Sequence, residues 1–274
     1  MVKKMIYIFI SNILEGKPLI DKYNLKKNLT YKKYEVFEGN EINIIICKSK
    51  LIYPALIIGD YFSNKEIKNN DFLLNIGTCG SSSCLKNETY VVNKINSFIM
   101  DKSLYPSMIY DLNLKEKSLY SSKSIVKEQI NDYDLFDLEA YSIFLSAQFY
   151  FNNEQIIILK TVLDNLSNVD QFTKDDIYEV MNNYDNIINR IIEISHSLIN
   201  TKEDTEKTLN FLLENLFNKY KFTNQMRINL SKHLTYLYNK DKINTINHIE
   251  NIISKNIEIK SKDDLKKVYN ELLQ

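Results

Sequence analysis

Arginine, cysteine and glycine are scarce in this chain of 274 residues, and tryptophan is absent. Only Arg190 and Arg227 are arginines, although the basic residues number 35. Proteins that read DNA or bind phosphate favour the bidentate guanidinium of arginine, so this scarcity weighs against both classes. Acidic residues also number 35, and the resulting formal net charge of +0 gives no overall attraction to nucleic acid or to an anionic surface.

The few cysteines do not form a disulfide framework. Cys47, Cys79 and Cys84 are an odd number, and the apolar run at residues 5–10 has no small-residue cleavage site behind it. We therefore expect a cytoplasmic protein with reduced thiols. The spacing of Cys79 and Cys84 leaves a redox or metal-binding pair open. However, all three histidines lie beyond residue 195, and we expect no bound metal and no cofactor.

Long apolar runs are absent too, because no stretch approaches the roughly 18 residues that a membrane-spanning helix needs. What the first 200 residues do contain is an alternation of strand-like and helix-like patterns. Strand-like runs occur at residues 5–11, 34–37, 42–47, 72–76, 89–95 and 155–163; helix-like patterns occur at 51–62, 138–151 and 174–199. Thr173 is the predicted N-cap of the last helix, and Gly77 to Gly80 are predicted to form a turn. The alternation predicts an α/β domain with a central mixed sheet over residues 1–200.

Residues 201–274 carry helical periodicity only, and we predict an all-helical C-terminal extension that packs on the first domain or on a partner. Its apolar stripes are formed by Leu209, Leu212, Leu213, Leu216, Phe217 and Tyr220; by Met226, Leu230, Leu234 and Leu237; and by further Ile, Leu and Val residues from Ile246 to Leu272. Basic residues exceed acidic ones here by 13 to 10, a surplus too small to favour nucleic-acid binding.

Three carboxylates stand where strands and helices of this pattern meet. Glu15 follows the first strand, Glu139 opens a helix, and Asp164 ends the strand at 155–163. The carboxyl ends of strands in such a sheet gather at one rim, where ligands bind, so these side chains are predicted to converge there. Each one alone has an ordinary explanation as a helix-start acid or a strand end; only the set of three indicates a site.

Four short segments, in this order, resemble the family of 5′-methylthioadenosine/S-adenosylhomocysteine nucleosidases and purine nucleoside phosphorylases. The family has an Ala-Met-x-x-Glu segment, a Gly-Ser-Ala-Gly-Gly turn, a Met-Glu-Ala helix start and a Ser-Asp-Asn strand end. Here they read Ser11 to Glu15, Gly77 to Ser81, Leu138-Glu139-Ala140 and Leu163-Asp164-Asn165. The resemblance covers residues 5–199 and implies a three-layer sandwich of the phosphorylase and nucleosidase type.

The resemblance also implies an activity, the cleavage of the N-glycosidic bond of a purine nucleoside. Asp164 would protonate the departing base, Glu15 would orient or deprotonate the attacking water, and Glu139 would bind the ribose hydroxyls. Further substrate contacts would come from Leu138, Thr78, Cys79, Gly80, Ile125 and Val126. By analogy, the partners would be a small-molecule nucleoside and a second copy of the chain in a homodimer.

The sequence departs from the family at a loop after the third strand. A Gly-x-Gly segment of the family reads Lys48-Ser49-Lys50 here, which would crowd a loop that comes close to the sugar or to phosphate. Hydrolysis is favoured over phosphorolysis because no arginine is placed to bind phosphate. A catalytically degenerate nucleoside-binding or scaffolding protein, with the helical tail for a partner, is the alternative.

Overall fold

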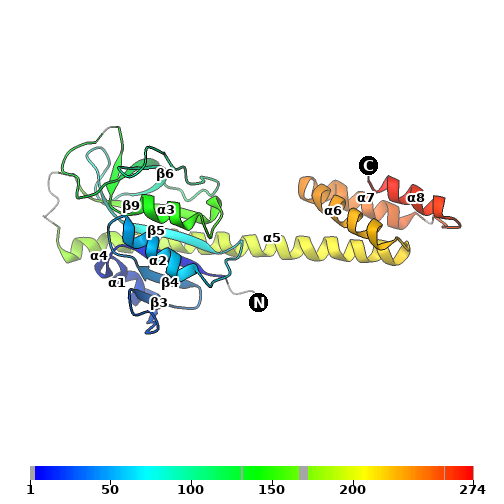
Figure 1. Cartoon of the computed structure of the whole chain (residues 1–274), viewed down its shortest axis with the longest axis horizontal. Helices are drawn as coiled ribbons and strands as arrows, with labels where there is room; N and C mark the ends of the chain where they lie inside the picture. Colours follow the sequence, from blue (N-terminus) through cyan, green and yellow to red (C-terminus); the bar gives the residue numbers. More distant parts are fainter. Residues whose placement is uncertain (1–3, 131, 167–171, 256, 274) are drawn as a thin grey trace. The chain divides into compact units, whose positions relative to one another are not determined.

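The computed structural model describes residues 4–130, 132–166, 172–255 and 257–273, with the backbone alone over 199–207 (Figure 1). The chain divides into two compact units, Met1–His196 and Ser197–Gln274. The helix α5 (Tyr184–Lys219) belongs to both units, and it runs through residue 200, where the sequence pattern changes.

The first unit is built on a mixed sheet that contains nine strands within the described residues. They are β1 (Ile6–Ile10), β2 (Lys26–Lys27), β3 (Glu35–Glu38), β4 (Ile42–Ile46), β5 (Phe72–Gly80), β6 (Thr89–Ser97), β7 (Glu116–Ser121), β8 (Leu135–Asp137) and β9 (Ile156–Asp164). Their order is β2-β3-β4-β1-β5-β8-β7-β6-β9, and β9 also pairs with β5 and closes a ring. β4, β1, β5 and β9 are parallel, so their carboxyl ends share one edge.

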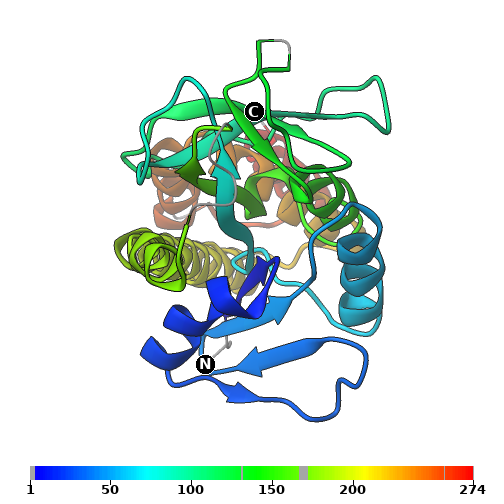
Figure 2. The same cartoon turned by 90° about the vertical axis from the view of Figure 1, so that its left-hand side faces the viewer.

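Helices cover both faces of this sheet (Figure 2). α1 (Ile13–Lys22), α4 (Lys174–Asn182) and the first part of α5 lie on one face; α2 (Ile52–Phe62) and α3 (Ala140–Ala147) lie on the other. A short 3-10 helix, Asn153–Gln155, precedes β9. β1 and β4 are buried along their whole length, which explains why they read as continuous apolar runs. The predicted three-layer α/β fold with a central mixed sheet is confirmed.

The predicted turn at Gly77 to Gly80 is wrong. β5 continues to Gly80 and pairs in parallel with β9 throughout, with one irregularity between Cys79 and Gly80. Neither glycine has a positive φ, so neither is needed for a turn. Both allow close approach instead: a Cβ on Gly80 would lie 2.9 Å from Asp164 Oδ1, and one on Gly77 would touch Glu15 Oε1 at 3.6 Å.

Two predicted helices have different bounds in the structure. The pattern at 138–151 forms a helix only from Ala140 to Ala147. The single helix expected from Thr173 to about residue 199 is two helices: Thr173 caps α4, which ends at Asn182, and α5 begins at Tyr184. Apolar periodicity runs through both helices, so it does not reveal the break at Asn183.

The second unit consists of helices wherever the structure describes it, and the predicted helical character of the C-terminal region is confirmed. After α5 come α6 (Asn224–Lys240), α7 (Lys242–Ser254) and α8 (Lys262–Glu271), with side-chain N-caps from Thr223, Asp241 and Ser261. The unit has its own core, formed by Leu209, Leu212, Leu213, Leu216, Tyr220, Phe222, Leu230, Leu234, Tyr238, Ile249, Ile252, Val268 and Leu272. Among the described helices of the whole chain, none is long and apolar enough to cross a membrane.

Candidate active site

A cavity of about 260 Å³ lies at the carboxyl edge of β1, β5 and β9. Every site residue predicted from the sequence lines it: Glu15, Thr78, Cys79, Gly80, Ile125, Val126, Leu138, Glu139 and Asp164. Lys48 and Lys50 do not line it, although Ser49 between them does. The three carboxylates therefore share one cavity, and the two lysines do not fill it.

Glu15 is held rigidly at the start of α1, with 2% of its surface exposed. Its Oε2 accepts hydrogen bonds from Ser11 Oγ at 2.5 Å and from Asn12 Nδ2 at 3.0 Å. Its Oε1 accepts hydrogen bonds from the Thr78 backbone N–H at 2.9 Å and from Thr78 Oγ1 at 2.6 Å. Four donors on one carboxylate fix its position against β5.

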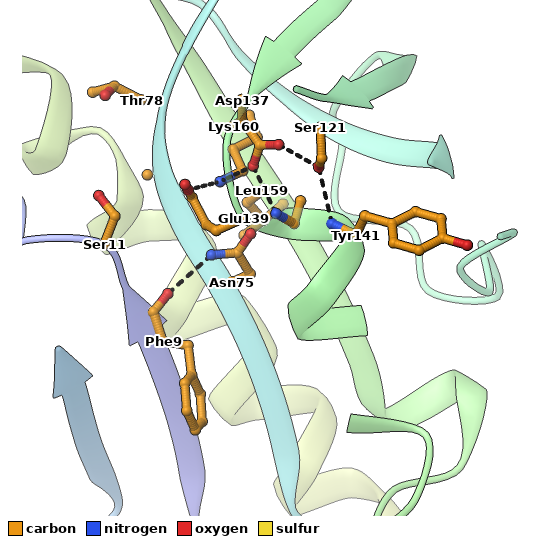
Figure 3. Close-up of polar contacts among 12 residues, drawn as sticks. Phe9, Ser11, Asn75, Thr78, Ser121, Asp137, Glu139, Tyr141, Leu159 and Lys160 are labelled. Carbon is orange, nitrogen blue, oxygen red and sulfur yellow. Dashed lines mark hydrogen bonds and ion pairs between the residues drawn. The ribbon is translucent and has the colours of Figure 1, made fainter. Parts of the chain in front are cut away.

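Glu139 belongs to a buried charge network that also contains Lys160 and Asp137 (Figure 3). Lys160 on β9 is fully buried, and its Nζ lies 2.8 Å from Asp137 Oδ2 and 2.8 Å from Glu139 Oε1. Asp137 in turn accepts hydrogen bonds from Ser121 Oγ at 2.5 Å and from the Ala140 backbone N–H at 2.9 Å. This places Glu139 at the N-terminus of α3 with a fixed carboxylate.

Burial and charge pull in opposite directions on the pKa values of this network. Burial raises the pKa of Glu139 to about 7, although the nearby Lys160 charge opposes the rise. Burial alone would lower the pKa of Lys160, but the carboxylates of Asp137 and Glu139 raise it well above its ordinary value. The two carboxylates therefore favour the charged form of Lys160, and the Lys160 charge opposes the effect of burial on the pKa of Glu139.

Asp164 is the last residue of β9, and it lines the cavity. Burial raises the pKa of its carboxyl above the ordinary value, against the opposing effects of the Leu166 N–H and the Lys86 charge. Asp164 Oδ1 accepts the Leu166 N–H at 2.9 Å. The apolar side chains that line the cavity are Ile125, Val126, Phe136, Leu138, Leu163, Leu166, Phe172 and Ile177. A carboxylic acid in such surroundings is suited to hold a proton and to donate it.

We expect Gly80→Ala to reduce any turnover at this cavity more than it reduces stability. The new Cβ would lie 2.9 Å from Asp164 Oδ1 and 2.7 Å from Leu166 Cδ2, so both side chains must move. A displacement of about 1 Å costs on the order of 10²-fold in rate when it affects a reacting group. Gly77→Ala is the comparison for stability alone, because its Cβ would meet nothing closer than 3.6 Å. Thermal melts of both variants, and single-turnover rates of Gly80→Ala against the wild type, test this; a Gly80→Ala protein with full turnover contradicts it.

The loop before α2 has a strained backbone next to the cavity. Lys48 and Lys50 have φ values of 61° and 88°, in the left-handed region that glycine adopts freely. The cost for such residues is roughly 1–2 kcal/mol each. The loop therefore has a backbone conformation that is typical of glycine, although lysines occupy these positions. The side chains of both lysines are exposed. Lys48 Nζ lies 5.5 Å from the centre of the Tyr53 ring, over α2.

Thiol and metal chemistry find little support in the described part of the chain. Cys79 lines the cavity, and burial raises the pKa of its thiol well above the ordinary value, so it stays protonated. All three cysteines are free. Among the described residues, no group of three or more His, Cys, Asp or Glu side chains is placed to hold a metal ion.

Sequence reasoning missed Lys160 and Asp137, although the sequence contained a signal for the lysine. Lys160 interrupts the apolar run of β9, where the preceding residues from Ile156 to Leu159 are all buried. A lysine in a strand that is buried on both faces requires a buried counter-charge. Asp137 stands two residues before Glu139, but only the fold brings it to Lys160.

Comparison with solved structures supports the interpretation of the fold. The chain is similar to the 5′-methylthioadenosine nucleosidase of Arabidopsis thaliana, with 17% identity, a TM-score of 0.58, and coverage of 70% of this chain and 96% of that chain. It is also similar to the futalosine hydrolase of Helicobacter pylori, with 14% identity, a TM-score of 0.58, and coverage of 70% and 98%. A third similar structure is the 5′-methylthioadenosine/S-adenosylhomocysteine nucleosidase of Neisseria meningitidis, with 10% identity, a TM-score of 0.57, and coverage of 69% of this chain and 98% of that chain.

No protein-family model and no curated protein sequence matches the chain. At these identities the structural likeness shows the fold, and it confirms the predicted resemblance at that level. The α/β unit has the same fold as these solved nucleosidases and the futalosine hydrolase.

Proposed function

We propose that this chain hydrolyses the N-glycosidic bond of a purine nucleoside. The observation that carries the proposal is the meeting of Glu15, Glu139 and Asp164 in one cavity, on a fold that solved nucleosidases share. The lining of the cavity combines apolar side chains with the carboxylates of Glu15, Asp137, Glu139 and Asp164. This combination suits a flat apolar base joined to a sugar with several hydroxyls.

Asp164 acts as the general acid in this proposal. Breaking the bond moves negative charge into the purine, and a proton delivered to the base makes it a better leaving group. The raised pKa of Asp164 suits a group that must carry this proton.

Glu139 binds the ribose and stabilises its cation. A carboxylate held by Lys160 on one oxygen can accept the sugar hydroxyls on the other. Positive charge develops on the ribose as the bond breaks, and a fixed carboxylate nearby stabilises it most in the transition state.

Glu15 and Lys160 position the attacking water. The point that a Cβ of Gly77 would occupy lies 3.6 Å from Glu15 Oε1, 3.6 Å from Lys160 Nζ and 3.9 Å from Glu139 Oε1. A water molecule near this point can donate a hydrogen bond to Glu15 and accept one from Lys160. Gly77 thus leaves room for a nucleophile among three charged groups.

Glu139→Gln should weaken nucleoside binding and turnover together. The amide still accepts a hydrogen bond from a hydroxyl, but it carries no charge to oppose the ribosyl cation and no longer pairs with Lys160. We expect KM to rise and kcat to fall, with the larger loss in kcat, on the order of 10²-fold. Steady-state kinetics measure both constants. A change confined to KM would show that Glu139 contributes to substrate binding and does not stabilise the transition state.

The proposal as a whole is tested by incubating the full chain with a panel of purine nucleosides, with and without inorganic phosphate. We expect free base and free sugar in both cases. Base release that requires phosphate would indicate phosphorolysis. Binding without base release under any condition would support the alternative, a nucleoside-binding protein that has lost catalysis.

We also propose that the first unit forms a homodimer. The first two turns of α2 expose three large apolar side chains, Ile52, Tyr53 and Leu56, and the first turn of α1 exposes Ile13 and Leu14. Exposed apolar side chains that lie together on a helix are characteristic of an interface. Sedimentation equilibrium should give twice the monomer mass, and Leu56→Glu should shift it towards the monomer.

A further inference from the structure

The lining of the cavity includes residues at the carboxyl ends of four neighbouring strands. Asp164 ends β9, Thr78 lies on β5, Ser11 follows β1 and Ser49 follows β4. These strands are neighbours in the order β4-β1-β5-β9. Adjacent strands are about 4.8 Å apart, so β4 lies roughly 14 Å from β9. If the base is at Asp164 and the ribose at Glu139, the 5′ substituent points towards Ser11 and Ser49; this step rests on the proposed function.

The β1 and β4 end of the cavity is polar. Its lining side chains are Ser11, Asn12 and Ser49, whereas the apolar lining comes from the loop after β7, from β8, from β9 and from the segment through α4. Ser11 and Asn12 already donate hydrogen bonds to Glu15. Among the described contacts Ser49 Oγ has no such partner. An alkyl group placed here would bury polar groups without replacing their hydrogen bonds to water.

Positive charge flanks Ser49 on both sides. Neither Lys48 nor Lys50 pairs with a carboxylate in the described part of the chain, and both keep a costly left-handed backbone where glycine would be relaxed. The cavity itself is lined by the carboxylates of Glu15, Glu139 and Asp164. Flexible lysine stems of four carbons at its rim can therefore provide the charge that an anionic substituent needs to enter.

We propose that the substrate carries an anionic group on its 5′ side, a carboxylate or a phosphate, which binds at the loop formed by Lys48, Ser49 and Lys50. Ser49 donates a hydrogen bond to the oxyanion, and the two ammonium groups neutralise it. The strained loop is then a specificity determinant for the 5′ substituent rather than an eroded remnant of a glycine loop.

The test compares three nucleosides that share one purine and differ at the 5′ position: a neutral methylthio group, a carboxylate-bearing group and a phosphate. Base release is followed with the full chain, with and without inorganic phosphate. We expect kcat/KM to be at least about tenfold higher for an anionic compound than for the neutral one, and the preference to shrink as salt is raised. An equal or higher kcat/KM for the neutral compound overturns the inference and leaves the proposed function intact.

Charge and strain are separated by variants of the loop. Lys48→Gln with Lys50→Gln removes the charges but not the strained backbone, and the anionic preference should fall to about one. Lys32→Gln with Lys33→Gln is the matched control, since it removes two exposed lysines elsewhere and should keep the preference. A double loop variant that keeps the preference overturns the inference.

The remaining outcomes separate the two proposals. A requirement for free phosphate would mean that the loop binds inorganic phosphate as a co-substrate, which overturns the assignment to the 5′ group. If no compound releases base, the proposed hydrolysis fails. Titration calorimetry of the neutral and anionic nucleosides then tests the role of the loop in binding. Tighter binding of the anionic compound that is lost in the double loop variant supports the inference. Equal binding of the two compounds overturns it.

Discussion

Asp164→Asn should abolish base release and leave nucleoside binding within a few-fold of the wild-type value. The amide keeps the volume of the side chain, and its oxygen can still accept the Leu166 N–H that Asp164 accepts at 2.9 Å. It has no acidic proton to give to the base. General acid catalysis contributes roughly 10²–10⁴ in rate, so the loss should lie in this range and should fall on kcat. Single-turnover rates and titration calorimetry measure the two quantities separately.

Asp175→Asn is the matched control for Asp164→Asn. Asp175 is an exposed residue in the first turn of α4, and the same chemical change there should leave turnover unaltered. Equal turnover of Asp164→Asn and wild type would remove Asp164 from the mechanism. Among the described residues, the other carboxyls that line the cavity belong to Glu15, Asp137 and Glu139, and none of them is proposed to protonate the base, so the hydrolysis proposal would then fail as well.

Lys160→Met should destabilise the first unit and stop turnover together. The substitution leaves the carboxylates of Asp137 and Glu139 buried without their shared cation. Removal of one partner from a buried ion pair costs about 3–5 kcal/mol, which corresponds to a Tm lower by roughly 10 °C. Lys117→Met provides the comparison, because Lys117 and Asp134 are both partly exposed and their ion pair is worth about 0–1 kcal/mol. Calorimetric melts distinguish the two cases.

The cost of Lys160→Met should also depend on pH. Without the lysine charge, the pKa of Glu139 rises beyond its value of about 7 in the intact network. A buried carboxyl with a raised pKa favours the folded state at low pH, and this advantage is lost as pH rises through that pKa. The difference in Tm between the variant and the wild type should therefore shrink on acidification. A difference that stays constant between pH 5 and pH 8 would show that the loss arises from packing and not from charge.

The sequence predicted the site better than it predicted the backbone that forms the site. Glu15, Glu139 and Asp164 were found because each follows or precedes a recognisable strand or helix, and parallel strands end at one edge. The Gly77–Gly80 segment was wrongly predicted to be a turn, because two nearby glycines after an apolar run indicate a turn when only the local sequence is considered. The steric requirement lies at Gly80, where a Cβ would be 2.7 Å from Leu166 Cδ2 and 2.9 Å from Asp164 Oδ1.

The sequence by itself indicated an alternation of strands and helices in the first 200 residues, the helical character of the remainder and the three carboxylates that line the cavity, but it did not indicate α1, β2, β7 or β8. Apolar periodicity and strand ends depend on residues that are close in sequence, so they can be recognised without knowledge of the fold. Tertiary structure alone decided that Lys160 pairs with Asp137 and Glu139, that Lys48 and Lys50 stand beside the cavity and not in it, and that the cavity has a polar end at Ser49. These features depend on residues far apart in the chain, whose distances and burial follow only from the packing of the strands against one another.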